Sequence, residues 1–78
     1  MAGKIDLDKI DETIAMNAHR GDSYLILFKD DPCRYVGIPL LDRMEEADGT
    51  FTFKVLEPED KKGMYKKALR DIVEMEKA

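Results

Sequence analysis

The sequence predicts a mainly β fold, in which an N-terminal α-helix precedes a five-stranded, strongly bent antiparallel sheet that curls into a small barrel. Apolar residues recur at helical spacing near the N-terminus. Several short β-prone runs, separated by turn residues, follow them. The second of these runs contains Gly37 and, two residues on, Pro39, a combination that favours a bent strand.

Composition predicts one soluble domain over residues 1–78. Of the 78 residues, 44% are hydrophobic and 38% are charged, which is too apolar for a disordered chain and too charged for a membrane protein. A chain of this length buries only about 60% of its unfolded surface, so oligomerisation often stabilises such a domain. There is no long apolar run and no signal-like start. We therefore expect a cytoplasmic protein with no membrane partner.

A helix is predicted over about residues 6–20. Four apolar residues follow one another at steps of three and four and so share one helical face: Leu7, Ile10, Ile14 and Ala18. Asp6 or Asp8 can cap the start of this helix, and Gly21 can end it. Because one face is apolar, the helix must lie on another element.

The first two strands are predicted over about residues 23–29 and 34–41. The run "DSYLILFK" is rich in aromatic and aliphatic residues, as a strand covered on both faces requires, and "DDPC" supplies turn residues after it. In "RYVGIPLL", a glycine costs stability unless the strand bends or another backbone comes close. We therefore expect the second strand to bend at Gly37.

Three more strands are predicted over about residues 50–56, 64–69 and 72–76. The stretch "EEADGT" contains an Asp-Gly turn signal, and "TFTFKVL" after it alternates apolar and polar residues. The last stretch, "MYKKALRDIVEMEKA", has a second interpretation, because its apolar residues also fit a helical stripe and its residue types favour a helix. That alternative is an α+β fold with a C-terminal helix on a three-stranded sheet.

We expect no enzyme, no cofactor and no metal site. His19 and Ser23 are the only residues of their types, and nothing in the sequence pairs them as base and nucleophile. Cys33 is the only cysteine, so an intrachain disulfide is impossible and a cysteine-histidine metal site lacks ligands. The net charge of −4 argues against extensive electrostatic binding to the phosphates of a nucleic acid, and we do not expect DNA as a partner.

A helix followed by five short strands, the second bent at a glycine, resembles the Sm and Sm-like (LSm) family over about residues 5–76. The first motif of that family is matched by "FKDD", "YVGIP" and Asp42, with one residue extra before Gly37 and one fewer after it. The second motif is matched by "LRDIVEM", in which Leu69, Arg70 and Ile72 fall at comparable places.

The resemblance implies a non-enzymatic protomer of a homo-oligomeric ring, in which the fourth strand of one copy pairs with the fifth strand of the next. It also implies that the ring binds single-stranded RNA or scaffolds ribonucleoprotein. The contacts that it implies are Lys29, Asp42, Arg43 and Arg70, with Tyr35 as a stacking residue. Two features depart from the family: "RMEE" after Asp42 brings two glutamates, and Asp71 follows Arg70 where the family has a glycine.

A second candidate function is protein binding without nucleic-acid activity. If the C-terminal stretch is a helix, the chain is a small protein-binding adaptor without nucleic-acid activity. Its basic face, directed at an acidic partner, then consists of Lys62, Lys66, Lys67 and Arg70.

Overall fold

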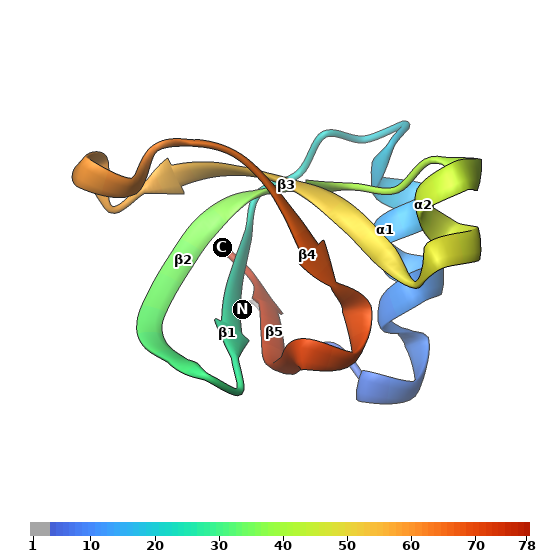
Figure 1. Ribbon diagram of the computed structural model, residues 1–78, viewed down its shortest axis with the longest axis horizontal. Coiled ribbons are helices and arrows are strands. Elements are labelled where there is room, and N and C mark those ends of the chain that lie inside the picture. Colours follow the sequence, from blue (N-terminus) through green and yellow to red (C-terminus); the bar gives the residue numbers. More distant parts are fainter. Residues whose placement is uncertain (1–3) are drawn as a thin grey trace.

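A helix followed by a five-stranded antiparallel sheet makes up the described part of the chain (Figure 1). The computed structural model describes residues 4–78, apart from the side chains of Arg43 and Glu46. In chain order the elements are η1 (Leu7–Lys9), α1 (Ile10–Asn17), β1 (Tyr24–Phe28), β2 (Asp31–Leu40), α2 (Arg43–Asp48), β3 (Thr50–Glu57), η2 (Glu59–Lys61), β4 (Gly63–Ala68), η3 (Leu69–Asp71) and β5 (Ile72–Lys77). The predicted mainly β fold with a preceding helix is confirmed.

The C-terminal stretch forms strands, so the alternative fold with a C-terminal helix is wrong. β4 pairs with β3 along its length, and β5 pairs with β1. These ladders outweigh helix propensity, which is only a weak preference. The second strand also begins earlier than predicted. Phe28 pairs with Asp31, which leaves only Lys29 and Asp30 as the turn.

The sheet bends strongly but does not close. Its strand order is β4-β3-β2-β1-β5, so β4 and β5 lie at its two ends, and no ladder joins them among the residues that the structure describes. Figure 1 shows the bend, which is largest in β2. The closed barrel of the prediction is therefore not confirmed, and the sheet has two outer strands.

A β-bulge lies opposite Gly37, the residue at which the sequence predicts a bend in β2. Val36 pairs with Glu57 and Gly37 pairs with Val55, so Leu56 is an extra residue on β3 at this point. Such a bulge increases the local twist and bends the pair of strands. Pro39 has no N–H group to donate. It pairs with Phe53 of β3 but lies past Gly37, where the pairing of β2 with β1 ends.

The core lies inside the bent sheet and under α1. Its buried apolar side chains are Ile10, Ile14, Tyr24, Ile26, Phe28, Tyr35, Leu41, Phe51, Phe53, Val55, Ile72 and Met75. Within this core, Phe28 makes edge-to-face contacts with Tyr35 and Phe53, with ring centroids 6.0 Å apart in both pairs. The core aromatic residues come from β1, β2 and β3, so they hold the three central strands together.

The helix is shorter than predicted and buries a different face. Ile10 and Ile14 are buried, but Leu7 is 55% exposed and Ala18 is exposed as well, so half of the predicted apolar face is wrong. The buried residue on the last turn is Asn17. The predicted ends are not those of α1: Asp6 accepts a hydrogen bond from the N–H of Asp8 and so caps η1, and α1 ends at Asn17, before Gly21 with its φ of 67°.

A second helix, α2, replaces the turn that "EEADGT" was predicted to form. Asp42 caps it, because its carboxylate accepts a hydrogen bond of 2.8 Å from the backbone N–H of Glu45. Glu45 is buried and accepts a hydrogen bond of 2.6 Å from the hydroxyl of Thr52 on β3. Gly49, with a φ of 71°, follows the helix. The short helix therefore covers the outer face of β3.

Candidate functional site

The outer strands β4 and β5 expose large apolar side chains. Met64 and Tyr65 on β4 are 61% and 39% exposed, and Val73 on β5 is 49% exposed. Val73 is also the extra residue of a β-bulge in the ladder between β5 and β1. The outer edge of a sheet is a template for pairing with another strand, and exposed apolar residues favour that pairing.

The same two strands carry opposite charges. β4 contains Lys66 and Lys67 and no carboxylate, whereas β5 contains Glu74, Glu76 and Lys77. The loop before β4 adds two lysines and two carboxylates, and Asp71 precedes β5 directly. The two edges of one sheet are therefore complementary in charge to each other.

The pairing of β3 with β4 sends one side of β4 into the concave side of the sheet. Phe53 pairs with Tyr65 and Phe51 pairs with Lys67. Because residues directly opposite each other share a face of the sheet, Tyr65 and Lys67 lie on the core side with the two phenylalanines. Lys66 lies on the outer face. The predicted basic helical face does not exist, because neighbouring lysines of a strand point in opposite directions.

Lys67 is held among three aromatic rings. Its ammonium group lies 5.1 Å from the ring centre of Phe28, 5.8 Å from that of Tyr35 and 5.6 Å from that of Tyr65. These distances are in the range of cation–π attraction. Lys67 therefore covers the aromatic core at the side where β4 and β5 are not joined, and the rings attract its positive charge.

Tyr35 and Asp31 form a hydrogen-bonded pair at the start of β2. The buried Tyr35 hydroxyl donates to the Asp31 carboxylate, which also accepts a 2.9 Å hydrogen bond from the N–H of Cys33. These two hydrogen bonds hold the pKa of Asp31 below its ordinary value. The hydrogen bond to Asp31, together with burial, raises the pKa of Tyr35. The pair fixes the β1–β2 turn against the core.

Two hollows flank Lys67. One is a small space of about 80 Å³ lined by Tyr35, Val55, Lys61, Tyr65 and Lys67. The other is a shallow space of about 250 Å³ lined by Phe28, Asp30, Asp31, Lys67 and Asp71. Within the described residues, no group of three His, Cys, Asp or Glu side chains is arranged to hold a metal ion.

Two of the predicted nucleic-acid contacts come from neighbouring segments. The N–H of Lys29 donates a 2.9 Å hydrogen bond to the carbonyl oxygen of Asp71, and the Lys29 ammonium lies 3.3 Å from the Asp71 carboxylate. Arg70, which is exposed, is the residue before Asp71. The β1–β2 turn and η3 therefore bring Lys29 and Arg70 into one region, with a carboxylate between them.

The other three predicted contacts lie elsewhere. Tyr35 is buried, its hydroxyl is bonded to Asp31, and its ring is covered by Lys67. Asp42 is exposed and caps α2. The side chain of Arg43 is outside the part of the chain that the structure describes. The turn between α2 and β3 does approach η3, because the N–H of Leu69 donates a 2.9 Å hydrogen bond to the carbonyl oxygen of Gly49.

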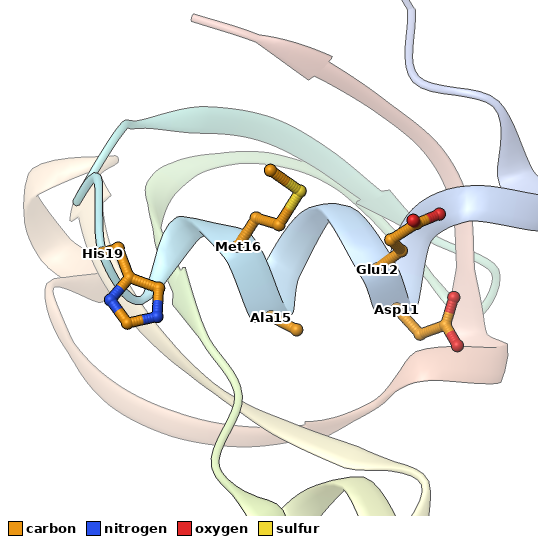
Figure 2. A pocket seen from close by; sticks show the side chains of 5 residues that line it. All are labelled: Asp11, Glu12, Ala15, Met16 and His19. Atoms are coloured by element: carbon orange, nitrogen blue, oxygen red, sulfur yellow. The ribbon is translucent and has the colours of Figure 1, made fainter.

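A groove along the exposed face of α1 has no convergent chemistry. Asp11, Glu12, Ala15, Met16 and His19 line it, and all of them come from α1 or from the turn after it. Figure 2 shows the two carboxylates at one end of the helix and His19 at the other. The imidazole therefore does not meet a carboxylate in this groove, which is an outer helix face.

No protein-family model, curated protein or solved structure matches this chain. The resemblance to Sm-like proteins therefore stays a prediction. None of the helices in residues 4–78 has the length and apolar character needed to cross a membrane.

Sequence reasoning missed Lys67, Tyr65 and Asp31 as parts of one cluster. The first two were signalled by the alternation in "MYKKA", because a strand places residues 65 and 67 on one face. Asp31 was assigned to a turn, and nothing in the sequence shows that it accepts a hydrogen bond from Tyr35. A partner of this kind is fixed by the register of the hairpin.

Proposed function

We propose that the chain is a non-enzymatic protomer that assembles head to tail, with β4 of one copy pairing with β5 of the next, into an Sm-like homo-oligomeric ring. The observation that carries this proposal is the pair of outer strands, which belong to one sheet, expose apolar side chains and carry opposite charges. Pairing between copies removes both edges from water.

Charge favours the head-to-tail arrangement over a two-fold dimer. Pairing β4 with β4 brings Lys66 and Lys67 close to the same residues of a second copy. Pairing β5 with β5 does the same for Glu74 and Glu76. Like charges directly opposite each other destabilise a strand pair, whereas opposite charges stabilise it. A head-to-tail contact leaves one edge free at each end, and a closed ring removes both.

A charge-reversal series tests this interface. Lys66→Glu on β4 and Glu76→Lys on β5 should each weaken assembly, measured as the protein concentration at which half of the protomers are assembled. The double variant should recover assembly, because it exchanges the two charges across the interface. The matched control is Lys54→Glu, which makes the same charge change at an exposed residue of the inner strand β3. Equal effects of Lys54→Glu and Lys66→Glu would exclude the β4 edge.

Single-stranded RNA is the ligand that we propose for such a ring, as a second step. The observation that favours it is that the β1–β2 turn and η3 lie together, through the contacts of Lys29 with Asp71, which brings Arg70 into the same region. A ring repeats these two cations once in each protomer, so one RNA strand can contact several protomers at the same time. Arginine can stack on a base and donate to phosphate.

Short oligo(U) and oligo(A) at several salt concentrations test RNA binding. Binding should weaken steeply with salt, because contacts to phosphate release counterions. Arg70→Ala should weaken it, whereas Arg20→Ala, which removes the same charge from the exposed turn after α1, should not. If the assembled protein binds neither oligonucleotide at low salt, the RNA proposal is wrong and the ring proposal stands on the mass measurement alone.

A further inference from the structure

The outer edge of β5 is already occupied over part of its length. Lys4 pairs with Glu76 in an isolated antiparallel bridge, and the N–H of Ile5 donates a 2.7 Å hydrogen bond to the carbonyl oxygen of Met75. A residue of an antiparallel ladder directs its N–H and its C=O to the same neighbour, so the Met75 carbonyl oxygen that bonds Ile5 belongs to the side of β5 that faces away from β1. The chain therefore pairs with its own outer strand.

A second contact holds the same segment. The ammonium of Lys4 lies 2.5 Å from the Glu74 carboxylate. This hydrogen-bonded ion pair raises the pKa of Lys4 and lowers that of Glu74. Glu74 is also one of the charges that β5 offers to a lysine-bearing strand. Lys4 thus takes the place of a lysine from β4 of another copy.

We infer that residues 4 and 5 form an intramolecular strap that competes with β4 of a neighbouring copy for the outer edge of β5, so that assembly requires the strap to leave. This inference rests on the head-to-tail assembly proposed above and names its regulation. The strap covers Met75 and Glu76 and leaves Val73, which is 49% exposed, uncovered. An incoming strand can therefore begin pairing at Val73 and displace the strap as pairing extends.

The contacts of the strap favour a reversible device. Among the described residues its contacts with β5 are one backbone hydrogen bond and one exposed ion pair, which salt screens, and the Ile5 side chain also packs against the core. The full edge of β5, in contrast, offers six residues to a strand of equal length, because both β4 and β5 contain six residues. Displacement therefore exchanges a short contact for a longer one.

Ile5→Pro tests the strap directly, with Ile5→Ala as its matched control. Both variants remove the isoleucine side chain, which packs against the core, but only proline also removes the N–H donor. Ile5→Pro should assemble at a concentration roughly fivefold lower per interface than Ile5→Ala, the ratio that corresponds to the net value of about one backbone hydrogen bond. Circular dichroism verifies that both variants fold.

A second pair of variants addresses the ion pair. Lys4→Glu places a like charge beside Glu74 and should promote assembly. Lys9→Glu makes the same charge change at an exposed residue of η1 and should not. In amide exchange, the N–H of Ile5 should be protected in the monomer and should lose that protection in the assembled form.

The outcomes separate the two proposals. If the wild type assembles and Ile5→Pro behaves as Ile5→Ala does, with the Ile5 amide still protected in the assembly, the strap inference is overturned and the interface stands. If the wild type and Ile5→Pro both stay monomeric at every concentration, the proposed assembly is wrong and the strap inference fails with it. A monomeric wild type that assembles only as Ile5→Pro supports both proposals.

Discussion

A Cβ atom on Gly37 would lie 2.3 Å from the carbonyl oxygen of Lys54 on the neighbouring strand, and 2.9 Å from the ring of Phe53. Real Cβ atoms do not approach a backbone oxygen so closely, so only glycine fits in β2 at this point. The close approach of β3 to β2, at the bulge between the two strands, explains why the bent strand needs its glycine.

Gly37→Ala should therefore destabilise the fold by about 1–3 kcal/mol, the usual cost of overpacking a well-packed site. The measurement is the free energy of unfolding in urea. Gly21→Ala is an informative comparison, because nothing lies within 4 Å of a Cβ there and the cost comes only from the φ of 67°. The steric explanation is wrong if Gly37→Ala unfolds at the same urea concentration as the wild type.

Asn17 should be a strong stability determinant. Its side-chain amide donates 3.0 Å hydrogen bonds to the carbonyl oxygens of Asp22 and Pro39, and its carbonyl oxygen accepts a 2.9 Å hydrogen bond from the N–H of Asp22. The residue is 1% exposed. Asn17→Ala leaves these backbone groups without partners and should cost about 2–3 kcal/mol in thermal or urea unfolding. Thr13→Ala, half-buried on the same helix, should cost much less.

The hydrogen bond between Tyr35 and Asp31 should make the free energy of unfolding depend on pH in the acid range. The pKa of Asp31 is lowered in the folded chain from an ordinary value of 3.8, so the stabilisation is fully present above that pH and is lost as pH falls through the folded pKa. Tyr35→Phe should show a smaller loss of unfolding free energy over roughly pH 2–5 than the wild type. Identical acid limbs would contradict this assignment.

The same hydrogen bond predicts that the free energy of unfolding falls as pH rises in the basic range. The pKa of Tyr35 is raised above its ordinary value of 10.0, mainly by the hydrogen bond to Asp31. Its contribution is therefore fully present below pH 10.0 and is lost as pH rises beyond that value. An ultraviolet titration of the wild type minus that of Tyr35→Phe should show a tyrosine that ionises late and together with unfolding. Ionisation of this residue in the ordinary range would refute the prediction.

The cap of α2 gives a further prediction. Asp42→Ala removes the acceptor for the N–H of Glu45 and should destabilise the protein by about 1 kcal/mol. Asp48→Ala, at the other end of the same helix, should not destabilise it, because a carboxylate there faces the negative end of the helix dipole. A helix that does not depend on its cap would give equal effects.

The sequence alone identified the first three strands, but it left residues 64–76 open between two strands and a helix. The alternation in "TFTFKVL" predicted a strand that is confirmed, and Gly37 lies beside the bulge between β2 and β3. In contrast, Leu7 has the spacing of the helical face but is exposed. It lies in η1, a 3-10 helix whose turns contain fewer residues than those of α1. Helical periodicity holds only where the helix is continuous.

Two features of the candidate site depended on long-range register. Asp42 and Glu45 have the spacing of a capping box, a local signal for α2 that was outweighed by the Asp-Gly pair after them. The position of Lys67 over Phe28, however, follows from β1, β3 and β4 being placed together, and no local pattern fixes it. The bridge between Lys4 and Glu76 is of the same kind, since it joins the two ends of the described chain.

The most direct measurement of the central claim is the absolute mass in solution, by light scattering behind a sizing column, over a range of concentrations at low and high salt. Head-to-tail pairing of β4 with β5 predicts a discrete mass of several protomers at low salt, which falls at high salt because the charges on the two edges are screened. The mass of one protomer at every concentration and both salt levels, for the wild type and for Ile5→Pro alike, would contradict the account.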